Sequence, residues 1–204
     1  MEKKREELLV RIRKIALETG VERVTIDRLC LKLQVSKEEL FSQFNSEEDL
    51  MASVLEYERD QFEKIIASRN FKEYCAIDAL LEVSKEMANK FDDISPKVTH
   101  GLSKYFPKIY AAHTDERVQY VYDKIKKNLE QGVIEGVYRS DFKPELISRL
   151  YISRLLDVLN PELFPPEEFS FEIVYSQMIE SFLRGITTPE GLKYFLNNKH
   201  KVNP

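Results

Sequence analysis

The sequence predicts an all-α protein of about nine or ten helices. Apolar residues recur at three- to four-residue spacing almost from one end of the chain to the other, which is the period of an α-helix. Glycine is scarce, with six in 204 residues, and no long stretch alternates apolar and polar residues. Sheets need that alternation and the tight turns that glycine allows, so a sheet-rich fold is disfavoured.

The first two predicted helices are short and amphipathic. The first places apolar residues on one face and ends at Gly20, where a left-handed residue commonly closes a helix; its face consists of Leu8, Leu9, Ile12, Ile15, Ala16 and Thr19. Thr25 can cap a second helix. The apolar stripe of that helix is Ile26, Leu29, Cys30 and Leu33.

A third and a fourth helix follow after a short connection. Ser36 and Glu39 have the spacing of a capping box for a brief third helix, with Leu40, Phe41 and Phe44 expected to face inward. Ser46 can cap a fourth helix that continues to about Ser68.

The rest of the chain has the pattern of a helical body. Breaks containing proline, glycine or aspartate separate helices expected near residues 71–91, 96–105, 114–136, 143–159, 167–185 and 189–198. We therefore expect a head of residues 1–46, a connecting fourth helix of residues 47–69, and a body of residues 70–204.

Charge is distributed unevenly between these parts. Residues 1–46 carry ten Lys or Arg and eight Asp or Glu, a net charge of +2, and the remainder carries 21 and 27, a net charge of −6. A mildly basic head on an acidic body is typical of a protein that binds nucleic acid through its head.

The segment from Thr25 to Leu50 resembles the tetracycline-repressor (TetR) family of bacterial transcriptional regulators. That family has a Thr before its second helix, a Val-Ser turn, a Leu-Tyr-x-x-Phe third helix and a Ser-Lys-Glu-x-Leu start to its fourth. The residues in register are Thr25, Leu29, Val35, Ser36, Leu40, Phe44, Ser46, Glu48 and Leu50. The resemblance implies a helix-turn-helix DNA-binding head and a ligand-binding and dimerisation body. It also implies a repressor that a small apolar molecule releases from a palindromic operator in double-stranded DNA.

In such a head, the third helix lies in the major groove, where base edges differ, and flanking residues contact phosphates. The candidates for base contact are Lys37, Glu38, Ser42 and Gln43. Gln43 can pair with adenine, and Glu38 can accept a hydrogen bond from cytosine N4. The candidates for phosphate contact are Thr25, Arg28, Ser36 and Lys37, with Lys3, Lys4 and Arg5 as a basic arm.

Four residues depart from the family pattern, one being Glu38, which stands where the family has a small residue. Gln34 replaces the usual Gly of the turn, Phe41 replaces a Tyr whose hydroxyl commonly holds a phosphate, and Glu47 replaces a Lys. These changes leave a second interpretation open, in which the protein is a helical dimeric ligand-binding or interaction protein that has lost DNA binding.

The last two long helices of the body, residues 143–159 and 167–185, are apolar on more than one face. Helices of this kind need two partners, and a four-helix bundle between two copies of the chain would supply both. The expected homodimer interface includes Leu150, Leu155, Val174, Met178 and Phe182. The alternative is that both faces belong to the internal core.

The middle helices are rich in aromatic residues, which suit a mostly apolar pocket with a few polar groups. The candidate ligand-binding residues are Tyr74, His100, Tyr105, Phe106 and Tyr122. Filling of the core is the alternative role for each aromatic residue.

Other classes of function find little support in the sequence. There is no Gly-rich phosphate loop, no nucleophile elbow and no metal-ligand spacing, so we expect no enzyme, no cofactor and no metal site. No apolar run approaches the roughly 20 residues of a membrane span. Cys30 and Cys75 are expected to be buried free thiols, which together with the absence of a signal-peptide pattern indicates a cytoplasmic protein.

Overall fold

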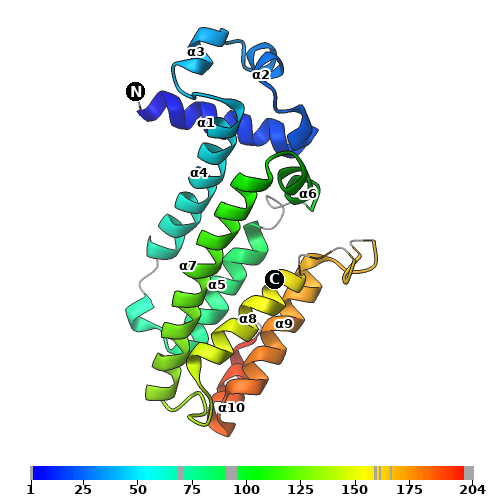
Figure 1. Ribbon diagram of the computed structural model, residues 1–204. Coiled ribbons are helices and arrows are strands. Elements are labelled where there is room, and N and C mark those ends of the chain that lie inside the picture. Colours follow the sequence, from blue (N-terminus) through cyan, green and yellow to red (C-terminus); the bar gives the residue numbers. More distant parts are fainter. Residues whose placement is uncertain are drawn as a thin grey trace. The chain divides into compact units, whose positions relative to one another are not determined.

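The computed structural model describes residues 2–68, 71–90, 96–158, 160, 162–165 and 167–199. These residues form ten α-helices and two short 3₁₀ segments, and no strand (Figure 1). The helices are α1 (Glu2–Thr19), α2 (Ile26–Leu33), α3 (Lys37–Phe41), α4 (Glu47–Ser68), α5 (Ala76–Lys90), α6 (Pro96–Tyr105), α7 (Pro107–Ile134), α8 (Pro144–Val158), α9 (Phe171–Ile186) and α10 (Pro189–Asn198). The 3₁₀ segments are η1 (Val21–Arg23) and η2 (Phe71–Glu73). The all-α prediction is confirmed.

By packing, the chain divides into two compact units. The first is formed by Met1–Ser68 and Asp93–Arg117, and the second by Arg69–Asp92 and Val118–Pro204. The first unit therefore contains the whole segment predicted to bind DNA, and also α6 and the start of α7.

The first unit is held together by apolar side chains from α1 to α4 and α6. Ile12, Leu29, Leu40 and Phe44 are completely or almost completely buried at its centre, and Leu102 of α6 belongs to the same cluster. Burying side chains of this size stabilises a fold by about 1.5–3 kcal/mol each. This core fixes the positions of the short helices α2 and α3, which could not hold their shape alone.

A polar cluster lies beside this core, where α1, α4 and α7 meet. The Arg13 guanidinium donates to the Glu58 carboxylate across a distance of 2.6 Å, and Arg59 pairs with Glu116. Burial and the charges of nearby arginines lower the pKa of His113 to about 4, so this imidazole is neutral at physiological pH. The cluster connects the first part of α7, up to Arg117, to α1 and α4 within the first unit.

The second unit is built around α5, α8 and α9. Ile77, Leu81, Leu129, Ile179 and Leu183 are nearly inaccessible in its core, and α8 and α9 pack side by side (Figure 1).

The connection between α7 and α8 is hydrogen-bonded to the end of α9 and to the residue that precedes α10. Arg139 N donates to Ile186 O at 2.8 Å, and Thr188 N donates to Val137 O at 3.0 Å. Gly191 lies so close to Val137 that a Cβ there would be 2.1 Å from the Val137 carbonyl oxygen. A glycine is therefore required at position 191 by close packing.

One predicted helix break is wrong. Residues 107–113 were placed between two helices, but α7 begins at Pro107 and runs without interruption to Ile134. Proline is favoured at the first position of a helix, because its missing N–H is not needed there. The predicted body helices otherwise agree with α8, α9 and α10 to within four residues.

Candidate nucleic-acid interface and ligand site

The turn between α2 and α3 has the helix-turn-helix form. Gln34 closes α2 in the left-handed conformation, with φ 58°, and its N–H donates to the Cys30 carbonyl. This conformation is easy for glycine and costs other residues about 1–2 kcal/mol. Ser36 then caps α3 by accepting a hydrogen bond from Glu39 N at 3.1 Å, as the sequence predicts.

The outward face of α3 differs from the prediction at one residue. Phe41 was expected in the core, but its side chain is 49% exposed, whereas Leu40 and Phe44 are buried. Because residues four apart lie on the same face of a helix, Phe41 shares a face with Lys37. The sequence pattern failed here because a helix of five residues shows too little of its period to separate an inward from an outward apolar residue.

The remaining candidates for base contact lie beside Phe41. Glu38 and Ser42 are exposed, and Gln43 is half-buried. The Ser42 hydroxyl donates to Glu39 O at 2.7 Å, and Gln43 Nε2 donates to Ser42 Oγ at 3.1 Å. Hydrogen bonds from its own amide and from Ser36 lower the pKa of Glu38, which therefore presents a full negative charge.

Several cations of the head are engaged within the head itself. Lys37 Nζ lies 2.5 Å from Asp27 of α2, and a hydrogen bond with that carboxylate, together with its charge, raises the pKa of Lys37.

The basic arm belongs to α1, and two of its three cations, Lys4 and Arg5, have partners within the head. Lys4 Nζ lies 2.7 Å from Glu39 Oε1, so the Glu39 side chain does not complete a capping box for α3. Arg5 donates to Ser53 Oγ at 2.6 Å and stacks over the Phe44 ring. Lys3 and Arg28 are exposed.

The start of α2 is capped by a residue from another helix. Thr25 has the extended backbone of a capping residue, but its side chain makes no capping hydrogen bond. Instead, Glu47 Oε1 of α4 accepts a hydrogen bond from Ile26 N at 2.9 Å. A helix N-terminus attracts anions, so Glu47 occupies a position at which a phosphate could otherwise bind.

The five candidate ligand residues are divided between the two units. Tyr105 and Phe106 belong to the first, where Tyr105 is largely exposed and Phe106 packs against the core. Tyr74 and Tyr122 are half-buried in the second, with Tyr74 against the Phe71 ring and Tyr122 under the Arg149 guanidinium. His100 lies in α6, but its side chain is outside the described part of the structure.

The core of the second unit contains a polar pair that the sequence did not single out as a ligand site. Tyr151 of α8 and Tyr175 of α9 are both buried and share a hydrogen bond, and Ser84 of α5 contacts Tyr175. Burial raises the pKa of both tyrosines. The Ser84 hydroxyl itself donates to Leu80 O. Three hydroxyl groups from α5, α8 and α9 therefore lie close together in this interior.

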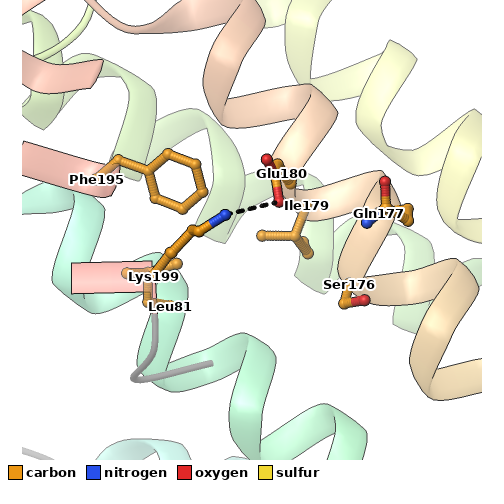
Figure 2. Close-up of a pocket in the computed structure, with 7 residues that line it drawn as sticks. All are labelled: Leu81, Ser176, Gln177, Ile179, Glu180, Phe195 and Lys199. Carbon is orange, nitrogen blue, oxygen red and sulfur yellow. Dashed lines mark ion pairs between the residues drawn. The ribbon is translucent and has the colours of Figure 1, made fainter. Parts of the chain in front are cut away.

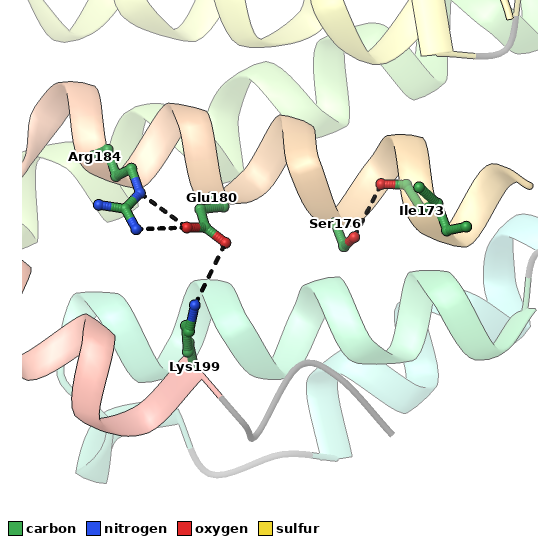
Figure 3. A network of polar contacts seen from close by, with 5 residues as sticks. All are labelled: Ile173, Ser176, Glu180, Arg184 and Lys199. Atoms are coloured by element: carbon green, nitrogen blue, oxygen red, sulfur yellow. Dashed lines mark hydrogen bonds and ion pairs between the residues drawn. The ribbon is translucent and has the colours of Figure 1, made fainter. Parts of the chain in front are cut away.

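A small pocket opens on the second unit beside α9 and α10 (Figure 2). Its lining residues are Leu81, Ser176, Gln177, Ile179, Glu180, Phe195 and Lys199. The volume of about 30 Å³ holds no more than one or two waters, whereas pockets for drug-sized ligands measure about 300–1,000 Å³. At its rim, Glu180 accepts hydrogen bonds from Arg184 at 2.9 and 2.6 Å and faces Lys199 (Figure 3). This pocket contains none of the predicted ligand residues.

The residues predicted at the dimer interface lie in two different environments. Leu155, Met178 and Phe182 are buried in the single chain's own core, where Phe182 packs edge-on against Tyr151. Val174 is half-buried, and Leu150 is 50% exposed. Leu146 of α8 and Ile173 of α9 are more exposed than Leu150.

This protein is similar to known proteins in its structure but not detectably in its sequence. No protein-family model matches the sequence, and no curated protein sequence matches it significantly. Among solved structures, a TetR transcription regulator from Haloarcula marismortui superposes with a TM-score of 0.77 at 17% identity, covering 92% of this chain and 100% of the other. The chain has the TetR-family fold. The reduced form of NemR from E. coli superposes with a TM-score of 0.70 at 17% identity, covering 91% of this chain and 98% of the other. A gamma-butyrolactone receptor described as an ArpA-like protein superposes with a TM-score of 0.69 at 12% identity, covering 98% of this chain and 96% of the other.

The helices of the first unit agree with the segment that resembles the TetR family. The capped turn, α3 and the start of α4 stand where the Thr25–Leu50 motif places them. Within the described ranges, no three His, Cys, Asp or Glu residues are grouped so that they could hold a metal ion. None of the described helices is both long and apolar enough to cross a membrane. Cys30 and Cys75 are free and half-buried rather than fully buried.

Proposed function

We propose that the protein is a dimeric transcriptional repressor that binds a palindromic operator in double-stranded DNA. The helix-turn-helix carries this proposal. The buried Leu40 and Phe44 hold α3 against the core, and Lys37, Glu38 and Ser42 remain exposed on its outward side. A short helix held in this way can enter the major groove and contact base edges.

A homodimer follows from the outward faces of α8 and α9. The exposed apolar residues Leu146, Leu150 and Ile173 form the apolar part of these faces. Pairing both helices with their copies gives a four-helix interface and places two α3 helices in symmetric half-sites. Because Leu155, Met178 and Phe182 are already buried, they support this interface from behind.

The second unit takes a small apolar molecule in this proposal. Similarity to a gamma-butyrolactone receptor supports a small-molecule role for the body. The hydroxyl groups of Tyr151, Tyr175 and Ser84 could orient such a molecule within the apolar core. If ligand weakens DNA binding, DNA must weaken ligand binding by the same factor.

A second function is favoured by the paired cations of the head. Asp27, Glu39 and Glu47 occupy groups that would otherwise bind phosphate. A protein of this fold that has lost DNA binding would act as a dimeric ligand-binding or interaction protein.

The two functions are separated by selecting duplexes from a random double-stranded DNA pool and titrating the enriched duplexes in increasing salt. A repressor binds particular duplexes, and its affinity falls steeply as salt rises. Arg28→Ala, which removes an exposed candidate for phosphate contact, weakens binding to all duplexes, whereas Gln43→Ala relaxes preference at one position. Absence of any enriched sequence would leave the second function.

Dimerisation has a separate test by sedimentation. Leu150→Arg places a charge on the proposed interface and is expected to give monomers. Ile134→Arg, on an exposed apolar residue at the end of α7, is the matched control and leaves the dimer intact. A Leu150→Arg variant that remains dimeric would place the interface elsewhere.

A further inference from the structure

The outward face of α3 carries one aromatic side chain, Phe41, which is about half exposed. Phe41 lies one turn after Lys37, and Glu38 and Ser42 flank it on the same exposed side. A phenyl ring has no donor or acceptor for a phosphate or a polar base edge. If this face binds DNA, the ring must therefore contribute in a way different from that of its polar neighbours.

Those neighbours direct most of their polar groups back into the head. Lys37 pairs with Asp27, the Ser42 hydroxyl donates to Glu39 O, and the Gln43 amide donates to Ser42. The Glu38 carboxylate also accepts hydrogen bonds from its own amide and from Ser36, so the Phe41 ring is the large apolar group that this face exposes. The ring is therefore central to the surface that would meet the floor of the groove.

We infer that Phe41 is a specificity-determining residue that contacts the 5-methyl group of a thymine in the major groove. The inference rests on the proposed function. Thymine is the base that carries an apolar group on its major-groove edge, and apolar side chains, Phe among them, recognise it by contact. Removing both groups from water is favourable, and no polar group is left unpaired.

Glu38 adds a second element to the expected site. Its Cα lies about 4.5 Å along the helix axis from that of Phe41, at a rise of about 1.5 Å per residue. Successive base pairs are about 3.4 Å apart. The ionised Glu38 can accept a hydrogen bond from a cytosine N4 amine. We therefore expect each half-site to contain a thymine within one or two base pairs of a C·G pair.

The test uses the enriched duplexes from the random pool, with one thymine at a time replaced by deoxyuridine. This replacement removes the 5-methyl group and leaves every hydrogen-bonding group in place. One thymine in each half-site should be sensitive, with affinity falling about fourfold, the value of one buried methyl group. The same replacement should not change the affinity of the Phe41→Ala variant.

Two further variants complete the design. Phe41→Tyr keeps the ring and should keep the thymine sensitivity, which guards against a folding defect in Phe41→Ala. Leu31→Ala removes another exposed apolar side chain of the head, on α2, and should also keep it. If wild-type affinity is unchanged at every deoxyuridine position, Phe41 does not contact thymine and the inference is overturned, while the proposed function stands. If no duplex is enriched, the proposed function fails and the inference fails with it.

Discussion

Glu47 is expected to limit the affinity of the head for DNA. Its carboxylate accepts a hydrogen bond from Ile26 N at 2.9 Å, and Thr25 makes no capping bond of its own. One charged side chain therefore stabilises the start of α2 and also blocks an anion-binding position. Replacing Glu47 separates these two roles.

Glu47→Gln keeps an oxygen that can accept from Ile26 N but removes the negative charge. The loss of the charge–dipole interaction should cost about 0.3–1 kcal/mol. Glu47→Ala also removes the acceptor and should cost about 1–2 kcal/mol, the usual effect of losing a helix cap. At this chain length, 1 kcal/mol lowers the melting temperature by about 2–4 °C.

DNA binding should change in the opposite direction. With the carboxylate gone, a phosphate can approach the α2 N-terminus, and each phosphate newly neutralised steepens the slope of log K against log salt by about 0.9. Between about 50 and 200 mM salt, that slope corresponds to a roughly threefold to fourfold additional loss of affinity. Affinity at low salt should accordingly rise severalfold.

The assay is fluorescence anisotropy with an enriched duplex, repeated over a series of salt concentrations, with thermal denaturation of each variant. Glu48→Gln is the matched control, because Glu48 is the exposed neighbour with the same charge, one residue along α4. If Glu47→Gln binds DNA no better than Glu48→Gln does, with the same salt slope, then Glu47 does not compete with phosphate.

Three other predictions concern stability. Since burial and nearby arginines hold the pKa of His113 at about 4 against 6.5 for a free imidazole, the unfolded chain binds the extra proton between these values. Stability is therefore complete above about pH 6.5 and falls by about 1–3 kcal/mol as pH drops toward 4, and His113→Gln should flatten that dependence in urea titrations at several pH values. Gly191→Ala drives a Cβ against Val137 O and should lower the free energy of unfolding by about 1–3 kcal/mol. Gly185→Ala in α9 meets no atom within 4 Å and should raise it by about 0.5–1 kcal/mol. Equal midpoints of the two variants in urea denaturation would contradict this. Gln34→Gly relieves a φ of 58° and should raise the melting temperature, with a net gain of up to about 1 kcal/mol; a lower melting temperature would indicate stabilising contacts by the Gln34 side chain.

The sequence predicted features that depend on neighbours within a few residues. Ser36 caps α3, and α10 occupies the expected residues 189–198. Both follow from local spacing. Pro107 shows the limit of local rules, because a proline can end one helix or begin the next with the same residues around it.

Features that depend on distant contacts were not predictable in this way. Glu47 caps a residue 21 positions earlier, and no local pattern indicates that pairing. An apolar stripe shows that a face avoids water, but it does not show whether the same chain or a second copy covers it. Because of this ambiguity, the sequence placed Leu155 and Phe182 at the dimer interface, whereas in the structure they belong to the internal core.

If the head binds DNA as proposed, its paired charges affect how it distinguishes one duplex from another. Binding to arbitrary DNA comes almost entirely from cations that neutralise phosphates. In this head, Lys37 and Lys4 already have carboxylate partners. Exchanging these partners for phosphates therefore adds little to the free energy of DNA binding. Affinity for arbitrary sequence should therefore be low, and the contribution of base edges correspondingly large. Phe41→Ala is therefore expected to lower the affinity for specific duplexes and to leave the affinity for arbitrary duplexes nearly unchanged, which lowers the ratio of the two. Asp27→Asn, which frees Lys37, is expected to lower the same ratio by raising the affinity for arbitrary duplexes.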